Sequence, residues 1–324
     1  FKLIIKCMRN YLYIFAQMYL NRFWLRHTVK LVDYIIEQGK GRTQYTNLCH
    51  HIIKYKGENV LMCEVDKAYL AGFVEYLKTA SPEYVKYKCR KREKHLSKGT
   101  QLTYYNLFRS ILNAAVKDSI LESNPANKLT SSQKPHHYEA SRTFLTIEEV
   151  KMLSGTEVSD QDKLICDAFL FCCFCGLRFS DVSSITWRQV QCLQDGSWQL
   201  ELVQKKTKSR LYLPLSKNAI SFMPPKGCSP DNARVFDLPP YWDINKVLSK
   251  WAKQAGIKKH VTFHASRHTF ATMALYYGAD LYTVSKLLGH ANINTTQIYA
   301  RIIDETKRKA VNLIPYLPRA KYKL

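Results

Sequence analysis

The spacing of apolar residues most constrains the fold of this chain, because it follows a helical period over long stretches and a strand period in one place. Between residues 26 and 130, apolar side chains recur every three to four positions, as on the buried face of a helix. Residues 198–203 and 210–215 instead alternate between apolar and polar side chains, which predicts a β-hairpin. We therefore expect a mainly α protein with a small antiparallel β-sheet, in the α+β class.

Changes in composition divide the sequence into two folded parts with connecting and terminal segments. A helix predicted from residue 99 closes at Asn124 and Pro125, and the Ser-, Lys- and His-containing stretch after it is expected to be an extended linker. Thr146, with Glu149 three residues later, forms a capping-box pattern and starts a new helical region. We expect an unassigned N-terminal segment (1–25), a helical domain (26–130), a linker (131–143), a second domain (144–313) and a tail (314–324).

The charge of the chain indicates an anionic partner. The formal net charge is +23 and the sequence pI is about 9.6, which favours nucleic acid as the partner over a basic surface that merely aids solubility. The densest basic run, at residues 86–98, precedes an amphipathic helix and is expected to contact DNA phosphates. The cations assigned to this contact are Lys88, Arg90, Lys91, Arg92 and Lys94.

The apolar segments of the chain argue against a membrane or secreted protein. No apolar run is long enough to span a bilayer, and the N-terminal stretch lacks the cleavage site of a signal peptide. The ten cysteines are scattered through apolar runs and are expected to stay reduced in the cytoplasm. Cys172 and Cys175 form a Cys-x-x-Cys pair without the further ligands that a zinc site needs. We expect no metal and no cofactor.

The second half of the chain places basic side chains at positions that backbone geometry would fix. Arg178 follows a glycine at a helix end, Arg267 lies one helical turn after His264, and His290 follows Gly289 at another helix end. Displacement at a phosphodiester increases the charge on the non-bridging oxygens, so a site for it needs several fixed donors. The arginine fork bonds two phosphate oxygens at once. This pattern indicates phosphoryl chemistry.

The order and spacing of these boxes resemble the tyrosine recombinases of the phage integrase family. The resemblance covers residues 144–313, and the helical region upstream fits the core-binding domain of that family. The sequence GLRFSDV and the cysteine-rich helix before it also resemble the corresponding segments of integrases of Bacteroides-type mobile elements. The matching residues are Gly176-Leu177-Arg178 with Asp181, the hairpin-turn Lys206, His264-Ala-Ser-Arg267-His268, Leu288-Gly289-His290, and Tyr299.

The resemblance implies a nucleophilic mechanism without metal or cofactor. Tyr299 attacks a DNA phosphate, forms a 3′-phosphotyrosine and releases a 5′-hydroxyl that later reverses the step. Arg178, Arg267 and His290 stabilise the pentavalent phosphorane, and His264 assists as an acid/base or a positioning donor. A free tyrosine has a pKa of about 10, so these neighbours must favour the phenolate as it forms.

The leaving 5′-oxygen needs a proton, which the family takes from a lysine on the hairpin turn. The spacing to Pro214 favours Lys206, and Lys208 is the alternative. The other turn lysines, Lys205 and Lys208, are then expected to contact DNA phosphates.

Two neighbours of the boxes are expected to support the site. Asp181 would orient an arginine or cap its helix, and His268 would act from behind the catalytic residues or by packing. The resemblance further implies double-stranded DNA as substrate, a tetramer on DNA that is a monomer when free, an accessory DNA-bending protein, and a place at the bacterial nucleoid.

Two other functions use similar residues. A type IB topoisomerase has a comparable Arg, Lys, Arg, His and Tyr set but religates the same strand, and the boxes HASRHTFAT and LGHANINTTQIYAR favour the recombinase. An inactive DNA-binding accessory factor on a decayed recombinase fold is the non-enzymatic alternative. Every candidate catalytic position holds a residue able to perform its role, which argues against the inactive factor. The expected reaction integrates, excises or inverts a mobile element.

Overall fold

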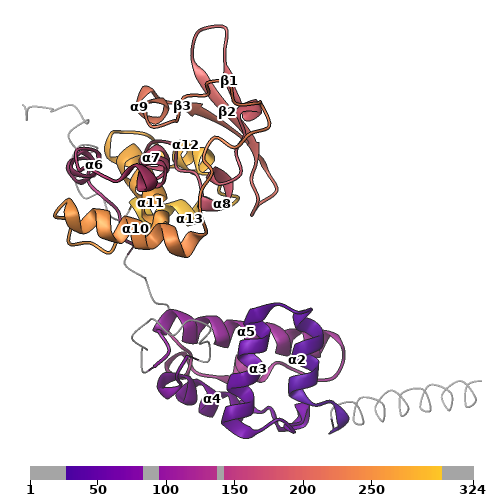
Figure 1. The fold of residues 1–324 in the computed structure, drawn as a ribbon. Helices are drawn as coiled ribbons and strands as arrows, with labels where there is room; N and C mark the ends of the chain where they lie inside the picture. The colour runs from indigo at the N-terminus through magenta and orange to yellow at the C-terminus, as the bar shows by residue number, and fades with distance from the viewer. Residues whose placement is uncertain (1–26, 83–94, 137–141, 301–324) are drawn as a thin grey trace, which may run out of the picture. The chain divides into compact units, whose positions relative to one another are not determined.

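The chain forms two compact units, Phe1–Ala140 and Ser141–Leu324, each with its own hydrophobic core (Figure 1). The structure, a computed structural model, describes residues 27–82, 95–136 and 142–300. The expected N-terminal segment, most of the basic run at 86–98 and the tail lie outside these residues. No helix in the described ranges combines the length and the apolar character needed to cross a membrane.

Helices make up most of the described part of the first unit. Their apolar faces meet at Phe73 and Phe108, which are fully buried and pack edge to face with ring centroids 5.3 Å apart. The Asp66 carboxylate caps one helix by accepting from the Tyr69 N–H at 2.7 Å. The elements are α2 (Leu31–Gly39), α3 (Thr43–Lys56), the 3-10 helix η1 (Met62–Glu64), α4 (Lys67–Thr79) and α5 (Lys98–Lys117).

Helix α5 ends at Lys117, so the prediction that it runs to Asn124 is wrong. Ser119 takes a left-handed conformation with φ of 62°, and the N–H of the next residue turns back to bond Ala115 O at 2.9 Å. The Asn124 side chain then caps a separate short element by accepting from the Ala126 N–H at 2.8 Å. Asn and Pro therefore begin a second element here instead of closing the first.

The segment after α5 is not extended throughout, contrary to expectation. It forms two 3-10 helices, η2 (Pro125–Lys128) and η3 (Ser131–Gln133). Leu129 between them is only 4% exposed and belongs to the core of the first unit. Apolar burial therefore holds Leu129, which lies at the end of the predicted helical domain (26–130), on the first unit, and η3 is the element that falls within the predicted linker (131–143).

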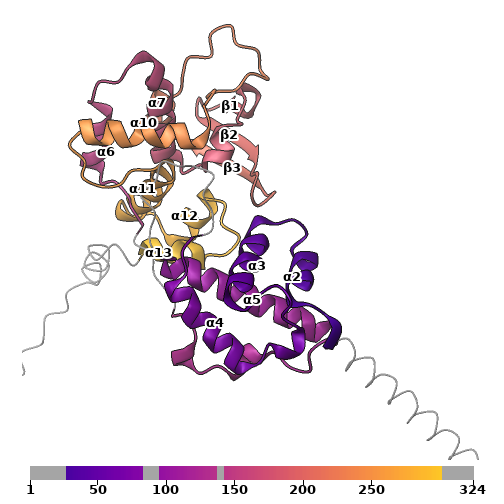
Figure 2. The same cartoon turned by 60° about the horizontal axis from the view of Figure 1, so that its bottom comes forward.

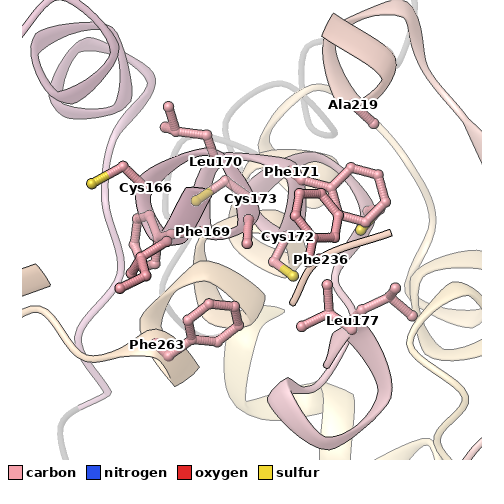
Figure 3. Close-up of a cluster of buried hydrophobic side chains, with 14 of the residues drawn as sticks. Cys166, Phe169, Leu170, Phe171, Cys172, Cys173, Leu177, Ala219, Phe236 and Phe263 are labelled. Carbon is pink, nitrogen blue, oxygen red and sulfur yellow. The ribbon is translucent and has the colours of Figure 1, made fainter. Parts of the chain in front are cut away.

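Helix α7 (Asp160–Cys175) is the centre of the second unit. From Ala168 to Cys175 it is apolar around its whole circumference, and a helix of this kind is stable only when other elements surround it. Its Phe169, Phe171, Cys172 and Cys173 side chains are fully buried (Figure 3). Helices α9 (Lys217–Ser221), α10 (Tyr241–Gln254) and α11 (Phe263–Tyr276) pack against it.

The remaining helices of the second unit include the one that the capping box predicts. Thr146 Oγ1 accepts from the Glu149 N–H at 3.3 Å, and the Glu149 carboxylate accepts from the Thr146 N–H at 2.8 Å. The prediction of a helix start at this position is confirmed. These helices are α6 (Ile147–Ser154), α8 (Phe179–Val182), η4 (Trp187–Gln189), α12 (Leu281–Leu287) and α13 (Asn294–Ala300).

The small sheet is a meander of three antiparallel strands, β1 (Val190–Cys192), β2 (Trp198–Val203) and β3 (Arg210–Leu215), in that order. The predicted hairpin is confirmed, because β2 and β3 pair along their whole length. Alternate leucines point into the core. The turn between β2 and β3 has six residues (204–209), and the sequence assigned its lysines to catalysis and DNA binding.

Gly176 ends α7 and turns the chain toward Arg178. It has φ of 71°, and its N–H bonds Cys172 O at 2.9 Å. A Cβ at this position would collide with the ring of Phe270. Glycine is therefore required here both for its left-handed backbone and for the absence of a side chain.

We expect Gly176→Ala to lower the free energy of unfolding of the second unit by about 2 kcal/mol, because the backbone is left-handed and the added methyl overpacks the core. Gly155→Ala is the matched control, since Gly155 also ends a helix but has φ of −87° and meets only ordinary contacts. Chemical denaturation followed by tryptophan fluorescence measures both variants. Equal stability of the two would contradict this account of Gly176.

Candidate active site

Arg267 is the buried centre of the site. It lies on α11, is 3% exposed, and donates from Nη1 to Gly176 O at 2.8 Å and from Nη2 to Leu288 O at 2.8 Å. Nη2 also lies 2.8 Å from His290 Nε2. Burial, with the charge of Arg178, lowers the pKa of Arg267 to about 10, which leaves it a cation at neutral pH. One side chain thus joins three of the boxes singled out in the sequence.

Arg178 stands beside Asp181 at the start of α8. Its Nη1 lies 3.8 Å from Asp181 Oδ2, and the carboxylate is fully buried. Among the described residues, neither of these two atoms makes a hydrogen bond. Asp181 Oδ1 accepts from the Lys205 N–H at 2.9 Å. Asp181 therefore orients the arginine and holds the hairpin turn, and it does not cap α8.

The hairpin turn is fixed from within by Gln204. This fully buried side chain donates to Leu288 O at 3.3 Å and accepts from Thr207 Oγ1 at 2.7 Å. Gly289 has φ of 62°, and a Cβ there would collide with the Gln204 amide. The backbone of the turn is therefore anchored to the loop that holds His290. The side chains of its lysines, Lys205, Lys206 and Lys208, are exposed.

His264 lies on the first turn of α11, on the same helix as Arg267. The residue is exposed, but its ring packs edge-on against His268 with centroids 4.6 Å apart. The ring is shielded on the side that faces His268. This partial burial of the ring, followed by the charge of Arg267 and other cations, lowers the pKa of His264. Lys206 is one of those cations, so its charge acts at the site from the hairpin turn.

Tyr299 is enclosed on α13. It is 2% exposed, and its hydroxyl lies 2.8 Å from His268 Nδ1. Burial raises the pKa of Tyr299, while the charges of Arg267, Arg142 and Arg178 act in the opposite direction. The phenol is therefore protonated and shielded from solvent in this structure. Helix α13 packs on α11 and α12, which bring the phenol and the histidines together (Figure 2).

His268 contacts the tyrosine directly. Its ring is 7% exposed, and burial, with the charges of His264 and Arg142, lowers its pKa to about 3. It is therefore neutral at physiological pH. The sequence placed His268 behind the site or in packing, and it gave no sign that a residue 31 positions away is its partner.

Arg142 is a cation of the site that the sequence analysis missed. The segment that follows Arg142 is attached to α11 by a hydrogen bond from the Leu145 N–H to Thr269 Oγ1 at 2.9 Å. The charge of Arg142 lowers the pKa of several groups at the site, namely His264, His268, His290 and Tyr299. From the sequence, Arg142 was predicted to lie in the linker (131–143). Its place just before the Thr146 capping box is the signal that favours the second unit instead.

Two further predictions concern the basic run and the Cys-x-x-Cys pair. The basic residues Lys88, Arg90, Lys91, Arg92 and Lys94 lie outside the described ranges. Cys172 and Cys175 are buried free thiols on α7. Within the described residues, no three His, Cys, Asp or Glu side chains are grouped as metal ligands.

The arrangement suits a phosphate diester. Among the described residues, the buried Nη1 of Arg178 makes no hydrogen bond besides its ion pair with Asp181, and the charge of Arg178 acts on Arg267 and His290. Charge-assisted donors of this kind bind phosphate oxygens strongly, and a tyrosine hydroxyl is the nearby group able to act as a nucleophile. Fold and site together define an enzyme of phosphoryl transfer.

Comparison with known proteins agrees with this class. Residues 29–131 match the phage integrase SAM-like domain, and residues 241–306 match the phage integrase family. The two stretches together span more than half of the chain. The chain belongs to the phage integrase family of tyrosine recombinases, and it is a site-specific recombinase.

Individual relatives extend over most of the chain. A tyrosine recombinase of Pseudothermotoga lettingae is 27% identical over 71% of this chain and 79% of its own length. Tyrosine recombinase XerC of Natranaerobius thermophilus is 28% identical over 79% of this chain and 84% of its own.

Solved structures share the fold. The integrase of transposon Tn1549, in complex with circular intermediate DNA, has a TM-score of 0.66 at 16% identity and covers 88% of this chain and 99% of its own. The XerH site-specific recombinase, bound to its difH substrate, has a TM-score of 0.59 at 18% identity over 85% of this chain and 80% of its own.

The buried His268 makes stability depend on pH. Its folded pKa lies below the value of about 6.5 for an unfolded histidine, so the unfolded state takes up a proton first as pH falls. We expect the stabilising contribution to be complete above pH 6.5 and to be lost below it, by at most about 1.4 kcal/mol per pH unit. Denaturation curves of the wild type and His268→Gln between pH 7 and about pH 5 measure it. If the free energy of unfolding changed with pH in the same way in both proteins, the burial of a neutral imidazole at His268 would be contradicted.

Proposed function

We propose that this recombinase binds double-stranded DNA and cleaves it through a covalent 3′-phosphotyrosine on Tyr299. The observation that carries the proposal is the burial of Tyr299 with its hydroxyl 2.8 Å from His268 Nδ1, where the charges of Arg267, Arg142 and Arg178 all favour its phenolate. The Tn1549 integrase structure is a complex with circular intermediate DNA, and the XerH structure is a complex with its difH substrate, which supports DNA as the substrate here.

The arginines hold the scissile phosphate. Arg178 directs its buried Nη1, and Arg267 directs Nη2, to the non-bridging oxygens, where negative charge increases during the reaction. His290 adds a donor to the same oxygens, and His264, at the exposed edge of α11, positions the phosphate or exchanges a proton with it. Removal of one such donor from an enzyme typically slows its reaction by about 10²- to 10³-fold.

The chemical step exchanges one phosphate ester for another. The Tyr299 hydroxyl gives up its proton to water as its oxygen forms a bond to phosphorus. The bond from phosphorus to the 5′-oxygen breaks, and Lys206 protonates that oxygen. The exposed Lys206 side chain extends from a turn whose backbone is fixed by Gln204 and Asp181. Its charge acts on His264, which supports Lys206 as the acid. Lys208 then contacts a DNA phosphate, as does Lys205.

In this structure the nucleophile is held away from solvent. The Tyr299 hydroxyl is hydrogen-bonded to His268 and shielded, so it must leave this position before it reaches DNA. With a pKa of about 3, His268 is too weak a base to take the phenol proton efficiently at neutral pH. Its role is to hold the neutral phenol until the DNA is in place.

The two units have different roles in the reaction on DNA. Residues 26–130 form the core-binding domain, residues 144–313 the catalytic domain, and residues 131–143 the connection between them. The basic run around Lys88 to Lys94 supplies further phosphate contacts, consistent with the net charge of +23.

Recombination requires the 5′-hydroxyl of a partner strand to attack the phosphotyrosine. We infer a tetramer on two duplexes, formed from chains that are monomers when free and aided by a DNA-bending protein at the bacterial nucleoid. Integration, excision or inversion of a mobile element of the Bacteroides type is the biological reaction that fits the resemblance of the GLRFSDV box.

We expect Tyr299→Phe to bind DNA like the wild type and to form no covalent adduct, because only the nucleophilic oxygen is removed. The assay traps adducts on nicked duplexes tiled across the DNA on either side of the coding gene. Tyr277→Phe, an exposed tyrosine of the same unit, is the matched control and should form the adduct. Trapping by Tyr299→Phe would disprove the nucleophile. Relaxation of any supercoiled plasmid by the wild type would instead indicate a topoisomerase.

We expect Lys206→Ala to slow cleavage by about 10²- to 10⁴-fold, as for loss of a general acid. A substrate with sulfur in place of the leaving 5′-oxygen should restore the rate, because a thiolate leaves without a proton. Single-turnover adduct formation measures both substrates. Lys205→Ala and Lys208→Ala are the matched controls, and rescue of Lys208→Ala by sulfur would transfer the role to Lys208.

A further inference from the structure

Helix α13 is held to the site by two hydrogen bonds between hydroxyls and histidines. Tyr299 lies against His268, and Thr296 Oγ1 lies 2.8 Å from His290 Nδ1. Thr296 is fully buried. It precedes Tyr299 by three residues, so the two side chains lie on one face of the helix. The histidine expected to bind the phosphate is thereby tied to the helix of the nucleophile.

The partners of His290 determine which of its ring nitrogens carries the proton. An arginine side chain can only donate hydrogen bonds, so His290 Nε2, at 2.8 Å from Arg267 Nη2, must be the acceptor. Burial and the charge of Arg267 lower the pKa of His290 to about 4, so the ring carries one proton at neutral pH. That proton is therefore on Nδ1, which donates to Thr296 Oγ1.

This tautomer cannot serve the phosphate. Its Nε2 has no hydrogen to donate, whereas stabilisation of a phosphorane oxygen requires a donor on the side that now faces Arg267. A proton on Nε2 in turn makes Nδ1 an acceptor, and the group opposite Nδ1 must then donate. A threonine hydroxyl can do either, because it turns about its C–O bond.

We propose that Thr296 is a positioning residue that supports both tautomers of His290 and so allows the switch between them when phosphate binds. In the free enzyme its hydroxyl accepts from Nδ1–H. When a phosphate replaces His290 as the partner of Arg267, Nε2 takes up one proton from water, Nδ1 releases one to water, and the hydroxyl turns to donate to Nδ1. The ring stays neutral. This role rests on the proposed function of His290 as a phosphate donor.

The chain offers a matched set of variants. Thr296→Val keeps the shape of the side chain and removes the hydroxyl, and Thr296→Ser keeps the hydroxyl. Thr295→Val removes the neighbouring hydroxyl, which is exposed. The thermal midpoint of each variant reports on folding.

Nitrogen-15 NMR of labelled histidines identifies the protonated ring nitrogen of His290, with His290→Gln for assignment. Inorganic vanadate, which forms five-coordinate adducts like the phosphorane, is the probe. We expect the wild type, Thr296→Ser and Thr295→Val to carry the proton on Nδ1 when free and on Nε2 with vanadate. Thr296→Val should fail to make this change.

Adduct formation on the duplex that traps the wild type provides the second readout. Thr296→Val should form the adduct about 10- to 100-fold more slowly than the wild type, as expected when a buried ring nitrogen is left without a partner. Thr296→Ser should form it at the wild-type rate. An unchanged tautomer response and rate in Thr296→Val would overturn the inference, as would a wild-type ring that keeps its proton on Nδ1 with vanadate bound. If the tautomer changes as expected but no adduct forms on any duplex, the switch stands and the proposed function fails.

Discussion

The site depends on the burial of a single guanidinium group. Arg267 is almost fully removed from solvent, and a charge in such a place is tolerated only when its donors are satisfied. Two backbone carbonyls, one after α7 and one after α12, and the ring of His290 satisfy them. Since those groups belong to the segments that also carry Arg178 and His290, the need to bond Arg267 brings the catalytic segments together.

The local elements of this fold follow from the sequence wherever their cause is local. The hairpin at 198–215, the Thr146 capping box and the turn at Gly176 each follow from side-chain alternation, a cap or a glycine within a few residues. The end of α5 did not, because a left-handed serine has no reliable signature in one sequence. The 3-10 helix at Ser131–Gln133, inside the predicted extended linker, was also missed.

Within the site, the residue boxes could be selected from the sequence through a family resemblance, but their contacts could not. The pairing of His268 with Tyr299, the anchoring of the hairpin turn by Gln204 and the effect of Arg142 all join residues far apart in the chain. Each depends on how helices pack, which the apolar period of an individual helix does not specify. The same holds for the proton on His290, which follows from its two partners and not from its own position.

The buried donor of Arg178 has a thermodynamic consequence. The site holds Arg178, Arg267 and the charge of Arg142 against one buried carboxylate, and Nη1 of Arg178 is desolvated without a hydrogen-bond partner in the described structure. Such a group reduces the stability of the empty enzyme. An anion that fills the position binds the folded state alone, so part of its binding free energy appears as resistance to unfolding. Under the proposed function, that anion is a phosphate of the DNA backbone, which then completes the folded catalytic unit.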